Sequence, residues 1–217
     1  PDLIVADSMA LWGKAVALKL NIPFICSTTT FAFNQHSAKI MKQSTWDLIK
    51  MLFSIPKTQK QVKRLKDKGY PVKNILDIIG SDDNTHTIVY TSPEFQPYSE
   101  TFSDKYEFVG PSVHCTTDEI EKTKGKLIYI SMGTVNNDMM PFYKSCISAL
   151  ANTDYEVIMS VGNLVSIDDF GKLPENISVY SHIDQIAVLE KADVFISHAG
   201  MNSVSESLYF EVPLVML

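Results

Sequence analysis

The sequence predicts an α/β protein with two domains, each built on a parallel sheet. Short apolar runs rich in β-branched residues alternate with helical stretches along most of the 217 residues. This rhythm is typical of parallel sheets, because parallel neighbours need a crossover connection. One stretch between the two expected domains, residues 116–126, is polar and poor in large apolar side chains. We therefore expect an N-terminal domain at residues 1–115, a linker at 116–126 and a C-terminal domain at 127–217.

Composition describes an ordinary globular protein and excludes several functions. The chain is 45% hydrophobic and 20% charged, with a formal net charge of −6, which argues against a general nucleic-acid or anionic-membrane binder. The three cysteines, Cys26, Cys115 and Cys146, show neither metal-ligand nor disulfide spacing, so a reducing, cytoplasmic compartment is expected. No apolar run reaches transmembrane length, and we expect no stable membrane insertion.

The N-terminal domain is expected to begin with a strand, a helix and a second strand. The helix extends to about residue 20 and places Trp12, Val16 and Leu20 on one apolar face. The strands of this domain are expected at residues 3–6, 22–26, 87–91 and 106–109.

Asp7 ends the first expected strand and has two interpretations. In open α/β sheets, functional side chains lie at the carboxyl ends of strands. A polar side chain at this place also suffices to cap the helix that follows. The residues alone favour the cap.

The C-terminal domain has the pattern of a Rossmann-like half. One helix is expected at residues 139–150, with Phe142, Cys146, Ile147 and Leu150 facing inward. The domain lacks G-x-G-x-x-G, so a nicotinamide or flavin dinucleotide is not supported. Its strands are expected at residues 127–130, 155–161, 177–180, 194–197 and 212–217.

A small polar turn after the strand at 194–197 has the chemistry of a phosphate site. His198 can donate to a phosphate oxygen, and Gly200 allows close approach of the backbone. A helix is expected at residues 203–210, and its first amides and its dipole favour an anion. Ser203-x-x-Glu206 is also a capping box, which needs no ligand.

The motif His198-x-Gly200-x-Asn202-Ser203-x-x-Glu206, followed by Val212-Pro213, resembles the donor signature of nucleotide-sugar glycosyltransferases with two Rossmann-like domains, the GT-B architecture. It is most similar to the bacterial, macrolide-glycosyltransferase-like branch of the UDP-glycosyltransferase family. The resemblance extends to a first donor loop and to a base-binding segment, in which His182 replaces the tryptophan of the plant branch. The donor-binding residues that it implies are Ser131, Gly133, Thr134, His182, Ile183, Gln185, His198, Gly200, Met201, Asn202, Ser203 and Glu206.

The resemblance also implies a reaction. A hexose, with glucose favoured, moves with inversion from a UDP-sugar to a hydroxyl of a small, apolar acceptor, without a metal or other cofactor. Asp7 orients a catalytic histidine that the family carries upstream of Pro1. The chain lacks an initiator Met and stops in or just after an apolar run, so a piece of a longer protein is expected. An acceptor pocket is implied near Phe31, Phe33 and Trp46, although for any one of these aromatics ordinary packing is the preferred interpretation.

Two alternatives stay open. One is a nucleotide-sugar 2-epimerase on the same architecture, and the other is a fragment that binds nucleotide and catalyses nothing. UDP is favoured over TDP as the donor nucleotide, but the residues do not exclude TDP. The donor sugar, the acceptor and the oligomeric state are not encoded in any motif of this chain.

Overall fold

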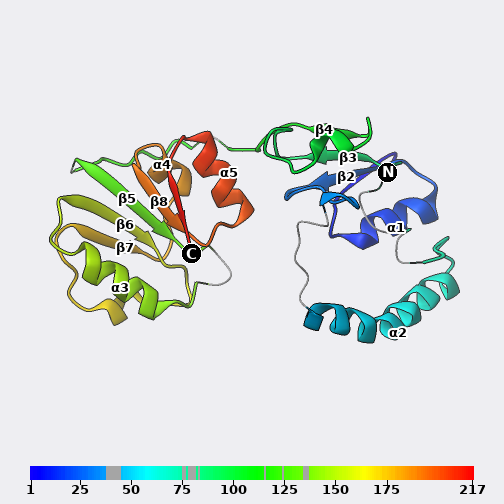
Figure 1. Ribbon diagram of the computed structural model, residues 1–217, viewed down its shortest axis with the longest axis horizontal. Coiled ribbons are helices and arrows are strands. Elements are labelled where there is room, and N and C mark those ends of the chain that lie inside the picture. Colours follow the sequence, from blue (N-terminus) through cyan, green and yellow to red (C-terminus); the bar gives the residue numbers. More distant parts are fainter. Residues whose placement is uncertain are drawn as a thin grey trace. The chain divides into compact units, whose positions relative to one another are not determined.

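A computed structural model shows the chain as two compact units, Pro1–Gly110 and Pro111–Leu217 (Figure 1). It describes residues 1–37, 45–74, 77, 82, 84–114, 116–123, 125–133 and 137–217, and only the backbone of residues 45–55. None of the helices in these ranges is long and apolar enough to cross a membrane.

The first unit is a four-stranded parallel sheet in the order β1-β2-β3-β4 (Figure 1). Two α-helices, α1 (Leu11–Leu20) and α2 (Thr45–Asp67), and a short 3-10 helix, η3 (Ser99–Thr101), accompany it. The parallel sheet predicted from the alternation of elements is confirmed. Its strands are β1 (Ile4–Asp7), β2 (Phe24–Thr28), β3 (His86–Val89) and β4 (Tyr106–Phe108).

The predicted inner face of α1 is wrong. Trp12 is 73% exposed and Leu20 is 53% exposed, whereas Ala15 and Ala17 are buried. The reason is a close approach of the helix to the sheet, since a Cβ on Gly13 would come within 2.5 Å of the Ala6 Cβ. Only small side chains fit between α1 and β1 at this separation, so the bulky residues point outward.

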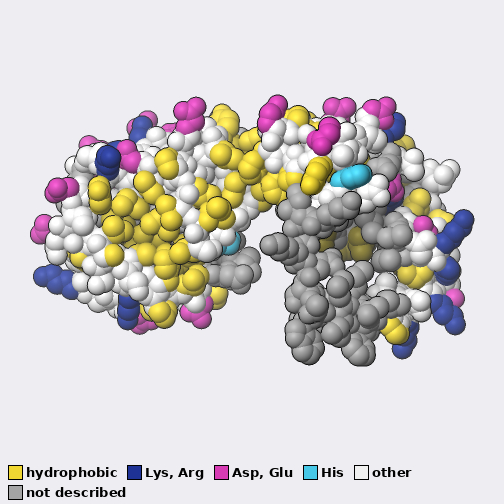
Figure 2. Space-filling view, viewed as in Figure 1, with side chains coloured by type: hydrophobic (Ala, Val, Ile, Leu, Met, Phe, Trp, Pro, Cys, Tyr) yellow, Lys and Arg dark blue, Asp and Glu magenta, His cyan; other side chains and the backbone are white. Residues whose placement is uncertain are grey.

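The second unit is a five-stranded parallel sheet in the order β7-β6-β5-β8-β9. All five predicted strands are present; two have the predicted ends, and the ends of the other three differ by at most two residues. In Figure 2, hydrophobic side chains gather in the middle of this unit's visible face, with charged side chains around the rim. The strands are β5 (Lys126–Ser131), β6 (Tyr155–Ser160), β7 (Ile177–Tyr180), β8 (Val194–Ser197) and β9 (Leu214–Met216).

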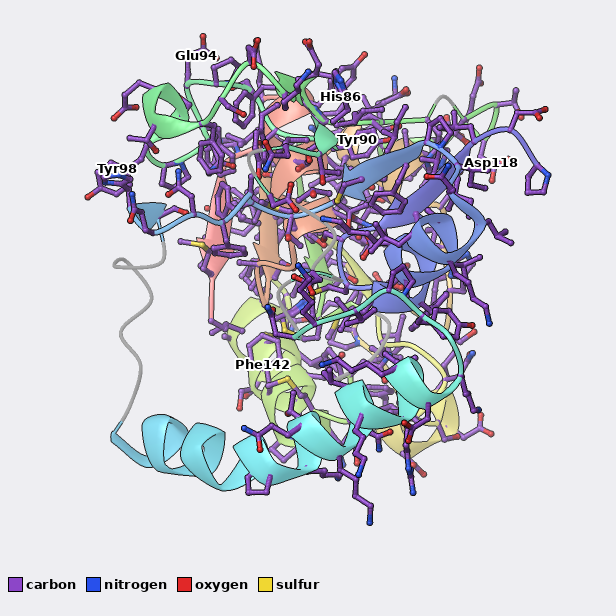
Figure 3. The ribbon with its side chains drawn as sticks, turned by 90° about the vertical axis from the view of Figure 1, so that its right-hand side faces the viewer. His86, Tyr90, Glu94, Tyr98, Asp118 and Phe142 are labelled. Carbon is purple, nitrogen blue, oxygen red and sulfur yellow. The ribbon has the colours of Figure 1, made fainter. Side chains whose placement is uncertain are left out.

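Helices cover both faces of this sheet. On one face lie α3 (Met140–Leu150) and the 3-10 helix η4 (Ile167–Phe170), over a core that includes Ile130 and Met159. All four predicted inward residues of α3, among them Phe142 (Figure 3), pack against this core. The other face, with α4 (Gln185–Leu189) and α5 (Met201–Tyr209), has its own core.

Residues 116–126, assigned above to a linker, are bonded to the second unit. The Thr116 hydroxyl donates to Asp184 Oδ2 at 2.5 Å, and Lys122 pairs with Asp193 at 2.6 Å. Asp193 Oδ2 also accepts the backbone N–H of Leu127, the second residue of β5, at 2.7 Å. These bonds fix the start of β5, the central strand.

Candidate functional site

The order of the strands locates the site in the second unit. From β5 the chain moves outward through β6 to β7, then returns to the other side of β5 with β8 and continues to β9. Strand order therefore reverses between β5 and β8, where Ser131 lies in register with Ser197. Open α/β sheets bind ligands outside the carboxyl ends of the strands at such a point, because the two loops diverge there and leave a crevice.

His198 bridges the two loops at this reversal. It follows β8, is exposed, and its ring lies against Gly133 of the loop after β5. A Cβ on Gly133 would lie 2.5 Å from His198 Cε1, and one on Gly200 would lie 2.9 Å from Nε2. The ring therefore fits only because both neighbours lack a side chain. Gly133 also has φ +76°, a conformation that favours glycine.

The start of α5 differs from the prediction, and the predicted capping box of Ser203 and Glu206 does not form. The helix begins at Met201 with Gly200 as its N-cap, and no side chain caps it. Ser203 is the third helical residue and is buried. Ala199, at φ +57°, turns the chain into the helix two residues earlier than expected. The first intrahelical bond runs from Val204 N–H to Gly200 C=O at 2.9 Å, so the amides of residues 201–203 precede it.

A chain of side-chain hydrogen bonds joins β5, α4 and α5. The Tyr129 hydroxyl donates to Gln185 Oε1 at 3.3 Å, and Gln185 Nε2 donates to Glu206 Oε2 at 2.5 Å. Burial raises the pKa of Tyr129 to about 12, while hydrogen bonds with Ser131 and Ser160 act in the opposite direction. Tyr129 thus stays protonated and remains a donor. The structure brings Gln185 and Glu206 together, which their separation in sequence does not reveal.

Asp184 sets the position of Gln185. Its Oδ1 accepts the N–H groups of Ile186 at 2.8 Å and Ala187 at 3.2 Å, so it caps α4. The hydrogen bond from Thr116 lowers the pKa of Asp184. His182 just before this helix is exposed, and Ile183 is partly buried in the core under it. An Asp preceding a short apolar run is a capping signal that identifies this residue in the sequence.

The loop after β5 has an anchor that the sequence analysis missed. Asn137 is buried and donates from Nδ2 to the Gly133 carbonyl at 3.0 Å. It packs on Gly162, where a Cβ would overlap its amide. Ser131 Oγ accepts the Gly133 N–H at 3.4 Å. Thr134 lies outside the described residues. An Asn four residues beyond a Gly carries no pattern of its own, so nothing in the sequence marks it.

In the first unit Asp7 does not cap α1. The N-cap is Ala10, which makes no side-chain bond, and Asp7 Oδ1 accepts the Met9 N–H at 2.8 Å. Thr29 Oγ1 donates to Asp7 Oδ2 at 3.4 Å. The cap is replaced by a local turn because the helix starts four residues after the strand ends, beyond the reach of this carboxylate. Asp7 therefore keeps its place at the carboxyl end of β1.

The expected acceptor residues have different surroundings. Phe31 packs against Phe95 with ring centroids 5.3 Å apart, whereas Phe33 is 47% exposed. The side chain of Trp46 lies outside the described part. Within the described ranges, no group of three or more His, Cys, Asp or Glu side chains could hold a metal ion.

Known proteins resemble this chain in sequence and in structure. Residues 127–217 match the model of the glycosyltransferase family 28 C-terminal domain. The chain is 37% identical to the NDP-glycosyltransferase YjiC of Bacillus licheniformis, over 99% of the chain and 54% of that protein. It is 28% identical to the demethyllactenocin mycarosyltransferase of Streptomyces fradiae, over 100% of the chain and 48% of that protein. The crystal structure of the glycotransferase of kitacinnamycin matches with TM-score 0.83 and 26% identity, over 100% of this chain and 57% of that one.

The fold is that of the GT-B glycosyltransferases. The chain belongs to the UDP-glycosyltransferase family within this class, so the family predicted from the motif at residues 198–206 is confirmed. The chain spans about half the length of the curated relatives it matches.

Proposed function

We propose that the second unit binds the nucleoside diphosphate of a UDP-sugar at the carboxyl ends of β5 and β8. The observation that carries this proposal is His198 held between Gly133 and Gly200 beside the start of α5. An imidazole and the free amides of residues 201–203 converge on one edge, where a diphosphate supplies the acceptors that these donors need.

The same groups suit the chemical step. When the bond between the sugar and the diphosphate breaks, negative charge grows on the leaving phosphate. Donors already fixed at that position stabilise this charge without reorganising. His198 is fixed by its two glycine neighbours, and the amides are fixed by the helix. The step needs no metal, and the proposal includes none.

The whole protein, as we infer it, is an inverting glycosyltransferase that moves a hexose, with glucose favoured, to a hydroxyl of a small apolar acceptor. Asp7 orients the catalytic histidine that the family carries upstream of Pro1. The acceptor hydroxyl loses its proton to that histidine and attacks the anomeric carbon, and UDP leaves. The cytoplasmic location inferred from the scattered cysteines stays a prediction; Cys26 and Cys146 are free thiols.

Calorimetric titration of this chain with UDP tests the proposal. We expect saturable binding that His198→Ala weakens about tenfold, the worth of one hydrogen bond to a charged group. His86→Ala is the matched control, because it removes another exposed imidazole, on β3 of the first unit (Figure 3). Equal affinity of wild type and His198→Ala would place the diphosphate elsewhere. A folded chain that does not bind UDP would contradict the proposal.

A further inference from the structure

The hydroxyl of Tyr129 is the single polar group of an otherwise hydrophobic side chain. Tyr129 is 1% exposed, and its ring stacks on Phe195 with centroids 4.9 Å apart and planes at 19°. The stack joins β5 to β8, the two strands that carry the proposed diphosphate site. Phenylalanine would fill the same space in this core, so packing alone does not explain the oxygen atom.

The bond from Tyr129 determines which way the Gln185 amide faces. A carboxamide has one accepting and one donating end. Because Tyr129 donates to Oε1, the NH₂ group must turn toward Glu206, and it donates to Oε2 there. With the amide reversed, its oxygen would face the carboxylate and the two would repel. Tyr129 therefore orients Gln185, and Gln185 holds the carboxylate of Glu206.

Held in this way, Glu206 keeps acceptor capacity for a ligand. A carboxylate has two oxygens with about four lone-pair sites. Among the described residues, Gln185 is the one hydrogen-bond partner of the Glu206 carboxylate, and its bond uses Oε2. Glu206 lies on α5, less than two turns beyond the Gly200 N-cap. In dinucleotide folds an acidic residue at the switch-point site accepts the ribose 2′-hydroxyl.

We propose that Tyr129 is a positioning residue that gives the site its preference for ribonucleotides over 2′-deoxyribonucleotides, acting through Gln185 and Glu206. The inference rests on the proposed UDP site. Without the Tyr129 hydroxyl, Gln185 Oε1 loses its donor, so the side chain is held at one end only and its bond to Glu206 is less firmly fixed. The contact that weakens is the one to the 2′-hydroxyl, which a deoxyribonucleotide does not have.

The test compares UDP with 2′-deoxy-UDP by calorimetry. For Tyr129→Phe we expect UDP binding to weaken roughly three- to tenfold, with 2′-deoxy-UDP binding unchanged. Tyr143→Phe is the matched control: Tyr143 is fully buried in the same unit, and its hydroxyl has no hydrogen-bond partner in the described structure. This variant should bind both nucleotides as the wild type does. In a Gln185→Met background, Tyr129→Phe should have no further effect on UDP binding.

Each outcome decides a different statement. If the wild type binds UDP and Tyr129→Phe binds it equally well, the inference is wrong and the proposed function stands. Equal losses for UDP and 2′-deoxy-UDP would mean a merely structural role for Tyr129, which also overturns the inference. If the wild type binds neither nucleotide, both proposals fall. Should Tyr129→Phe not fold, Gln185→Met must show the same selective loss of UDP.

Discussion

At the scale of single residues, the contact between Gly200 and His198 leads to the first prediction. Gly200→Ala places a Cβ 2.9 Å from His198 Nε2, so the imidazole must move. Gly200 has φ −58°, which any residue adopts, so we expect the free energy of unfolding to fall by less than about 1 kcal/mol. UDP affinity should fall about tenfold. Calorimetry and urea unfolding measure the two effects.

Gly125→Ala is the control for this change. A Cβ there meets no atom within 4 Å, so neither affinity nor stability should change. If Gly200→Ala bound UDP normally, a fixed orientation of His198 would not matter for the site.

The sequence showed which residues could bind phosphate but not which of them touch. His198, Gly200 and Glu206 stand out because one short motif holds them. The Tyr129–Gln185–Glu206 chain depends on three elements whose packing no local pattern encodes. The capping box failed because Ala199 adopts a left-handed conformation that alanine rarely takes, so propensity pointed to a later helix start.

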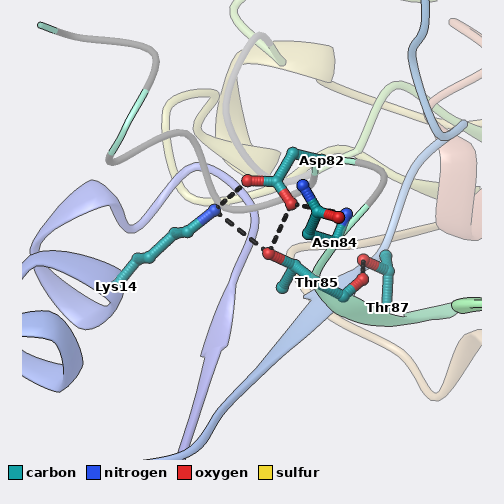
Figure 4. A network of polar contacts seen from close by, with 5 residues as sticks. All are labelled: Lys14, Asp82, Asn84, Thr85 and Thr87. Atoms are coloured by element: carbon teal, nitrogen blue, oxygen red, sulfur yellow. Dashed lines mark hydrogen bonds and ion pairs between the residues drawn. The ribbon is translucent and has the colours of Figure 1, made fainter. Parts of the chain in front are cut away.

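At the scale of elements, a buried lysine anchors α1 to the segment before β3. Lys14 Nζ pairs with Asp82 Oδ2 at 2.5 Å and donates to Thr85 Oγ1 at 3.1 Å (Figure 4). Burial raises the pKa of Asp82, but hydrogen bonds from Lys14, Thr85 and the Asn84 N–H outweigh it, and the pKa is lowered overall. The Asp82 side chain is 41% exposed, so solvent screens part of this attraction.

This lowered pKa predicts acid sensitivity of the first unit. A carboxylate with a lowered folded-state pKa contributes stability that is fully present above its unfolded pKa of about 3.9. The contribution is lost as the pH falls through the lower folded value. Urea unfolding from pH 7 to pH 2 should show this loss in the wild type.

Lys14→Met should flatten the acid dependence and cost about 1–2 kcal/mol at pH 7, after allowance for screening. Lys66→Met, at an exposed position of α2, should change neither the acid dependence nor the stability at pH 7. An unchanged pH profile in Lys14→Met would show that the ion pair does not shift the titration of Asp82.

The alternation of elements was predictable, whereas the orientation of α1 was not. Strands and helices follow from the period of apolar residues, which is local. The inner face of α1 depends on the separation between helix and sheet, and that separation is set by Gly13 against Ala6. Hydrophobicity alone therefore selected Trp12 and Leu20, the wrong residues.

At the scale of the whole molecule, the two units have separate cores, and this predicts two unfolding events. Phe195 is fully buried in the second unit, so Phe195→Ala should destabilise that unit by about 3–5 kcal/mol. Val89→Ala is the reciprocal change in the first unit, where Val89 is equally buried. Each variant should lower the midpoint of one calorimetric transition only. A single transition that both variants shift would contradict separate units.

UDP should raise the midpoint of the second unit's transition alone, because a ligand stabilises the unit that binds it.

The stacked pair of Tyr129 and Phe195 has a consequence for the divergence of such sites among related proteins. One base change turns a tyrosine codon into a phenylalanine codon, and the core would keep its shape. Selection for folding or for expression yield would therefore not remove this substitution. In related chains, the residue at the position of Tyr129, tyrosine or phenylalanine, would then indicate whether each lineage has come to accept a ribonucleotide or a deoxyribonucleotide.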